Sequence, residues 1–66
     1  MSIKMVNYFE DIETTFDNVR IITVKSGKEL NECRLRLKST HNYYVITTNI
    51  ENHYFDTKYW FVSLKQ

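Results

Sequence analysis

Cysteine, glycine, proline and alanine are nearly missing from this chain, which has one Cys, one Gly and no Pro or Ala. The single cysteine, Cys33, excludes an internal disulfide and with it a secreted, disulfide-stabilised scaffold. We therefore expect a reducing compartment and predict a cytoplasmic protein, or one of the host cytoplasm if the source is a virus. With 66 residues, the chain is predicted to form one small domain of modest stability.

Long apolar runs are missing as well. No apolar stretch approaches the 18 or so residues that a membrane-spanning helix needs. Residues 1–9 also lack the continuous apolar core of a signal peptide. The sequence thus predicts no membrane partner.

A clear excess of either charge is missing too, because nine Lys and Arg face eight Asp and Glu, for a formal net charge of +1. This balance gives no global electrostatic argument for nucleic acid. The distribution is uneven: residues 1–18 hold one lysine and four acids, whereas residues 19–66 hold eight Lys or Arg and four acids. Asn, Lys, Ile, Tyr and Phe make up 27 of the 66 residues. These amino acids use A/T-rich codons, so we predict a phage or another mobile element as the source.

Residues 5–19 carry apolar side chains at helical spacing. The intervals between them are 4, 3, 4 and 3 residues, which places them on one side of an α-helix. These apolar residues are Met5, Phe9, Ile12, Phe16 and Val19. We predict an amphipathic helix over residues 5–17. The competing interpretation is a strand that has Val6, Tyr8, Ile12 and Phe16 on one face.

The rest of the chain has the patterns of strands. In residues 32–38, Cys33, Leu35 and Leu37 alternate with charged residues, which is typical of a strand with one buried face. Polar turns at residues 26–28 and 39–42 separate predicted strands at residues 19–25, 29–38, 43–50 and 59–65. We predict an α+β fold in which the helix packs on one face of a four-stranded antiparallel meander. The alternative is an all-β small barrel or sheet. The expected core is Phe9, Ile12, Phe16, Ile21, Cys33, Leu35, Leu37, Tyr44, Ile46, Trp60 and Val62.

Catalytic and metal-binding patterns are weak. Cys33, His41 and His53 are the best metal ligands, but they lack the paired spacing of a structural zinc site. The two histidines lie near Glu51 and Asp56 in sequence and could serve acid–base chemistry. Two exposed loop histidines are the simpler interpretation, so we predict no enzyme activity, metal, cofactor or small-molecule substrate. The acids of the predicted helix could imitate nucleic-acid phosphates, but such acids usually form only a solvated helix face, and that is the favoured interpretation. They are Glu10, Asp11, Glu13 and Asp17.

The outer face of the predicted sheet is the strongest candidate for a binding site. Cations and aromatic rings alternate there, where a solvent-facing sheet would normally be polar. Aromatic and Arg residues are enriched in protein interfaces. We predict a small binding protein, an inhibitor or regulator that docks on a larger protein through this face or an edge strand; a homodimer is a variant. The alternative is a protein that binds single-stranded nucleic acid through the same face. The predicted binding residues are Arg34, Arg36, Lys38, Tyr43, Val45, Tyr59 and Phe61.

Overall fold

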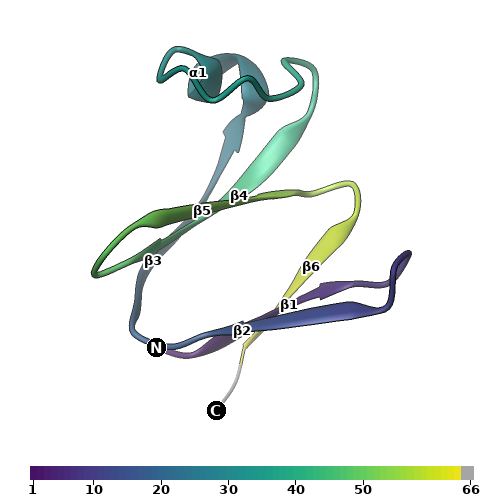
Figure 1. The fold of residues 1–66 in the computed structure, drawn as a ribbon, viewed down its shortest axis with the longest axis vertical. Coiled ribbons are helices and arrows are strands. Elements are labelled where there is room, and N and C mark those ends of the chain that lie inside the picture. Colours follow the sequence, from purple (N-terminus) through teal and green to yellow (C-terminus); the bar gives the residue numbers. More distant parts are fainter. Residues whose placement is uncertain (65–66) are drawn as a thin grey trace.

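The computed structural model describes residues 1–64 and is mostly β, with one short helix (Figure 1). The strands are β1 (Ile3–Asn7), β2 (Ile12–Phe16), β3 (Val19–Ser26), β4 (Asn42–Thr48), β5 (Asn52–Asp56) and β6 (Trp60–Leu64), and helix α1 (Gly27–Asn31) lies between β3 and β4. They form two three-stranded antiparallel sheets: a first sheet with the order β2-β1-β6 and a second with the order β3-β4-β5. No helix in this part of the chain is long and apolar enough to cross a membrane.

The main core joins the two sheets. Ile3 and Met5 of β1 and Ile46 of β4 are fully buried, and Val19 at the start of β3 packs with them. Alternate residues of a strand point to the same side, so Asn7, two residues after Met5, is also buried. The half-buried residues around this core are Phe16, Ile22, Tyr44, Phe55, Trp60 and Val62.

A second apolar cluster covers the other face of the second sheet. Helix α1 and the segment that follows it place Leu30, Leu35 and Leu37 against Tyr43 and Val45 of β4, with Tyr54 of β5 beside them. Ile46, on the opposite face of β4, packs in the main core, so β4 is buried on both of its faces. This explains why its sequence is apolar at consecutive positions rather than at alternate ones.

Hydrogen bonds between side chains and the backbone fix the segment after α1. The Asn31 side-chain amide donates to the Leu37 carbonyl at 2.7 Å, and its oxygen accepts from the Leu37 N–H at 2.5 Å. The Lys38 N–H donates to the Tyr43 hydroxyl at 3.1 Å. The segment has no regular secondary structure, and these three hydrogen bonds hold it over the second sheet.

The predicted helix at residues 5–17 is wrong, because the structure has β1, a turn and β2 there. Met5 does face the core, but Phe9 lies in the turn and is exposed. The buried alternation in β1 is Ile3, Met5 and Asn7, and the polar side chain of Asn7 hides that pattern in the sequence. The strand alternative is also wrong in detail, because it placed Val6, not Met5, on the buried face.

The predicted strand at residues 29–38 is wrong as well, and with it the α+β meander. Ser26 caps α1 by accepting a hydrogen bond from the Glu29 N–H at 3.1 Å, so residues 26–28 begin a helix and do not form a hairpin turn. Leu35 and Leu37 are half-buried as expected, but Arg34 and Arg36 have φ of 63° and 52°, which is incompatible with an extended strand. The mostly β fold is nearer to the all-β alternative.

The other three predicted strands correspond to β3, β4 and β6, with Lys65 of the last one outside the described residues. Their pairing differs from the meander, because β4 pairs with β3 and β5 and Ile46 lies opposite Ile22 and His53. Of the predicted core residues, Ile46 is fully buried and most others are half-buried. Those that are exposed are Phe9, Ile12, Ile21 and Cys33.

Candidate functional site

Four aromatic side chains lie in two contacting pairs beside the first sheet. Antiparallel pairing sets Asn7 of β1 opposite Trp60 of β6, so the turn that follows β1 lies beside the turn that precedes β6 (Figure 1). The Tyr8 and Phe61 ring centroids are 5.1 Å apart, and those of Phe9 and Tyr59 are 5.5 Å apart. We call Tyr8, Phe9, Tyr59 and Phe61 the aromatic surface.

The aromatic surface is exposed and yet ordered by its own contacts. Tyr8 is 71% exposed and Phe9 is 74% exposed. Their interplanar angles to Phe61 and Tyr59 are 56° and 80°, within the tilted and edge-to-face geometries that aromatic pairs prefer. Each such pair contributes about 0.5–1.5 kcal/mol beyond area burial, which favours these ring orientations before any partner binds.

Asn7 shapes the turn that presents Tyr8 and Phe9. Its side-chain oxygen accepts hydrogen bonds from the Phe9 N–H at 3.0 Å and the Glu10 N–H at 3.1 Å. Asp11, with φ of 54°, then turns the chain into β2, a conformation that Asp and Asn tolerate better than other side chains. A position pointing into the core thus holds a polar residue that orients the aromatic surface.

Replacing Asn7 with alanine is expected to lower the free energy of unfolding by about 1–3 kcal/mol, because two partly buried amides lose their acceptor. The turn should loosen, so the ring contacts of Tyr8 and Phe9 should weaken while those in the core persist. Chemical denaturation measures the first effect, and aromatic NMR cross-peaks between Phe9 and Tyr59 measure the second. An unchanged Phe9–Tyr59 contact in Asn7→Ala would show that the rings do not depend on this turn.

Acidic side chains outnumber basic ones around the aromatic surface. Glu10 and Asp11 lie in the same turn as Phe9. On the other side, Lys58 places its Nζ 5.7 Å from the Tyr59 ring centroid, within the range of a cation–π contact. Glu13 is paired with Lys4 on the outer face at 3.7 Å, an exposed ion pair of little energetic weight.

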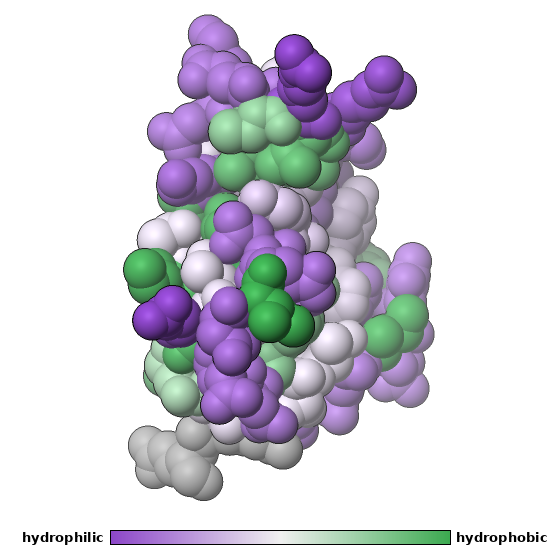
Figure 2. Space-filling model, turned by 60° about the vertical axis from the view of Figure 1, so that its left-hand side comes forward, coloured by the Kyte–Doolittle hydropathy of each residue, from purple (hydrophilic) through white to green (hydrophobic). Residues whose placement is uncertain are grey.

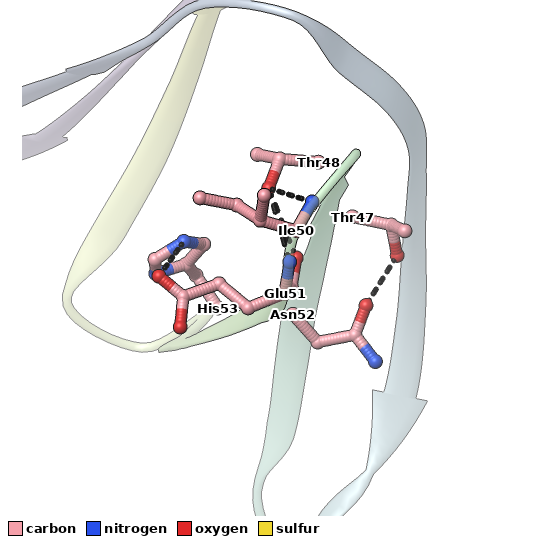
Figure 3. A network of polar contacts seen from close by, with 6 residues as sticks. All are labelled: Thr47, Thr48, Ile50, Glu51, Asn52 and His53. Atoms are coloured by element: carbon pink, nitrogen blue, oxygen red, sulfur yellow. Dashed lines mark hydrogen bonds and ion pairs between the residues drawn. The ribbon is translucent and has the colours of Figure 1, made fainter.

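Each histidine lies beside a carboxylate. His41 Nδ1 is 2.6 Å from Asp56 Oδ2. His53 Nε2 is 3.3 Å from Glu51 Oε1, and Figure 3 shows this second pair. Residues 1–64 form no pocket beside either pair and no cluster of three or more metal-ligating side chains. Asp56 has a structural role, because its Oδ1 accepts from the Lys58 N–H at 2.9 Å and so fixes the turn that carries Tyr59.

Burial raises the pKa of the Asp56 carboxyl, but hydrogen bonds from His41 and the Lys58 N–H outweigh it, so the pKa lies below its ordinary value. A carboxyl whose pKa is lower in the folded state stabilises the fold above the pKa of the unfolded chain, about 3.9 for an aspartate. This contribution is lost as pH falls through the lower pKa of the folded state.

We therefore expect thermal stability to fall as the pH is lowered from about 5 to about 2, with a smaller fall in Asp56→Asn, which cannot ionise. The melting temperatures of the wild type and of Asp56→Asn are measured across this pH range and compared. Parallel curves for the two proteins would assign the acid sensitivity to other carboxylates.

The β4–β5 turn forms a different kind of surface. Thr48 Oγ1 lies 3.4 Å from the Ile50 N–H and 3.3 Å from the Glu51 N–H, accepting from both, and Thr47 donates to Asn52 at 2.8 Å (Figure 3). Ile50 is 82% exposed and belongs to neither apolar cluster of residues 1–64. On this side of the molecule, hydrophilic residues separate the apolar areas (Figure 2).

The structure does not bring the predicted binding residues together. Tyr59 and Phe61 belong to the aromatic surface, whereas Tyr43 and Val45 are buried beneath the leucines of the second cluster. The cations expected between them are exposed on the segment between α1 and β4; they are Arg34, Arg36 and Lys38. The acids assigned to a helix face lie instead on the β1–β2 hairpin and just after it, where Asp17 accepts from the Ser2 hydroxyl.

Sequence reasoning missed Tyr8 and Phe9, which it assigned to a helix. A signal was present, since Asn7 followed by Asp11 brackets a short segment with turn-forming residues. Comparison of the chain with family models, with curated proteins and with solved structures found no match. The assignment of this site therefore rests on the geometry of the chain's own residues.

Proposed function

We propose that this chain is a non-enzymatic binding protein that docks on another protein through the aromatic surface. The observation that carries the proposal is the exposure of Tyr8 and Phe9, whose rings contact Phe61 and Tyr59 in tilted and edge-to-face geometry and are largely open to water. Exposed and preorganised aromatic rings lose little conformational entropy on binding, and aromatic residues dominate protein interfaces. Binding without chemistry is consistent with a role as an inhibitor or regulator of its partner.

Charge supports a protein partner over single-stranded nucleic acid. Glu10 and Asp11 adjoin Phe9, and carboxylates beside the rings would repel the phosphates that accompany stacked bases. The basic residues of the site predicted from sequence, Arg34, Arg36 and Lys38, lie on the segment after α1, away from the β1–β2 turn (Figure 1). The partner best suited to this surface has an apolar centre with basic residues at its edge.

The double variant Tyr8→Ser/Phe9→Ser tests the proposal, with Ile50→Ser as the control, because Ile50 is an exposed apolar residue on another turn. Tagged proteins are recovered from the native cell, and the bound protein is quantified for each. We expect the double variant to lose the bound protein, since removing an interface aromatic commonly costs about 2 kcal/mol or more, while the control retains it.

Two results would contradict the proposal. One is full retention of the partner by a folded Tyr8→Ser/Phe9→Ser protein. The other is recovery of nucleic acid whose binding to the wild type weakens steeply as salt rises from about 50 to about 200 mM.

A further inference from the structure

Strand β6 differs from the other edge strands. The sheet orders leave four edges, β2 and β6 in the first sheet and β3 and β5 in the second. Edge strands commonly carry charged residues that prevent pairing with another chain. Within residues 1–64, β2 has Glu13, β3 has Arg20 and Lys25, and β5 has Asp56, whereas β6 has no charged side chain.

The two faces of β6 follow from its register with β1. Trp60, Val62 and Leu64 lie opposite the buried Asn7, Met5 and Ile3 and share the core side, whereas Phe61 and Ser63 lie opposite Val6 and Lys4 on the outside. Leu64 is nevertheless 65% exposed. Because β6 is an edge strand, no neighbouring strand of its own sheet covers Leu64 from the open side.

The sequence W-F-V-S-L of β6 is complementary to itself in antiparallel pairing about Val62. Such a pair sets Trp60 opposite Leu64 of a second copy, so the indole covers the exposed leucine. On the outer side it sets Phe61 opposite Ser63, a large side chain beside a small one, with no charge brought against another. A two-fold symmetric contact requires this kind of self-complementarity.

We infer that the chain forms a symmetric homodimer in which β6 pairs with β6 of a second copy, joining the two first sheets into one six-stranded sheet. This goes beyond the proposed function, because it rests on the edge of β6 and not on the exposure of Tyr8 and Phe9. Phe61 lies on the outer side of β6 and contacts Tyr8, so pairing also brings the two aromatic surfaces onto one face of the continuous sheet. The dimer would thus present twice the aromatic area to a larger partner.

Sedimentation equilibrium of the full chain from about 10 µM to about 1 mM tests the inference. We expect a monomer–dimer equilibrium that Leu64→Lys weakens by about tenfold or more, because an ammonium group would be buried against Trp60 of the other copy. Val24→Lys is the matched control: Val24 is 58% exposed on the edge strand β3, and its replacement should leave the dimer intact. Circular dichroism confirms that both variants are folded.

Isotope-filtered NMR on an equal mixture of labelled and unlabelled wild-type protein gives a test that needs no variant. Contacts between the Trp60 ring and the Leu64 methyl groups of different copies are expected, and residues four apart on one strand are too distant to produce them within a chain. A monomer at every concentration, or a dimer whose contacts arise elsewhere, overturns the inference. Neither outcome touches the proposed function, which Tyr8→Ser/Phe9→Ser tests separately.

Discussion

Ile46→Ala is expected to lower the free energy of unfolding by about 2–5 kcal/mol. Ile46 is 0% exposed and lies in the middle of β4, with Ile22 on one side and His53 on the other. Truncation removes its transfer free energy and leaves a cavity where both sheets meet. A domain this small has only a few kcal/mol of stability, so a large fraction of the variant should be unfolded in water.

Urea denaturation of Ile46→Ala beside Ile50→Ala measures this effect. Both variants lose the same atoms, but Ile50 is exposed on the β4–β5 turn, so its truncation should change stability by less than about 0.5 kcal/mol. Equal midpoints for the two variants would mean that Ile46 is not at the centre of the core.

Gly27→Ala is expected to disrupt the segment over the second sheet. A Cβ at Gly27 would lie 1.9 Å from the Lys38 carbonyl oxygen and 3.1 Å from Cε1 of Tyr43. Alanine stabilises a helix by up to about 1 kcal/mol relative to glycine. That gain is smaller than the free-energy cost of displacing the Lys38 backbone. We expect a net loss of about 1–3 kcal/mol or more.

Hydrogen exchange locates this effect, because the Gly27 N–H donates to the His41 carbonyl at 2.7 Å and the His41 N–H to the Lys38 carbonyl at 3.1 Å. Both amides should lose protection in Gly27→Ala while β1 amides keep it. Lys28→Ala, on the exposed next residue, is the control and should behave as wild type. Unchanged protection at His41 would show that the chain does not pass so close to Gly27.

Some of this fold was predictable from local pattern. The β-branched run of β3, the aromatic and β-branched run of β4 and the alternation of Trp60 and Val62 in β6 identify strands, because their side chains fit a pleated surface. Ile46 was assigned to the buried face of its strand, and it is fully buried.

The N-terminal hairpin was not predictable from apolar spacing alone. Met5, Ile12 and Phe16 happen to fit a helical period, while Asn7 occupies a buried strand position for the sake of the turn. Tertiary burial of a polar side chain breaks the alternation that identifies a strand.

The segment after α1 was wrongly predicted as part of a strand for a different reason. Leu35 and Leu37 alternate with arginines as in a strand, but the backbone at Arg34 and Arg36 is left-handed. Within the apolar run of residues 43–46, Tyr43 and Val45 were assigned to an open aromatic face and Tyr44 and Ile46 to the core. A strand that carries apolar residues on both faces is better explained by burial of both faces. Because of this error, the predicted site included the buried residues Tyr43 and Val45. Of the predicted site residues, only Tyr59 and Phe61 lie in the aromatic surface.

Photo-cross-linking in the native cell tests most directly whether the aromatic surface is the contact surface. A benzophenone-bearing phenylalanine analogue is placed at Phe9 in one protein and at Ile50 in another, since both positions are exposed and lie on turns at opposite sides of the fold (Figure 1). We predict that irradiation links the first protein to one defined partner protein and that the second gives no such product. Cross-linking to that partner from Ile50 but not from Phe9 would contradict the assignment.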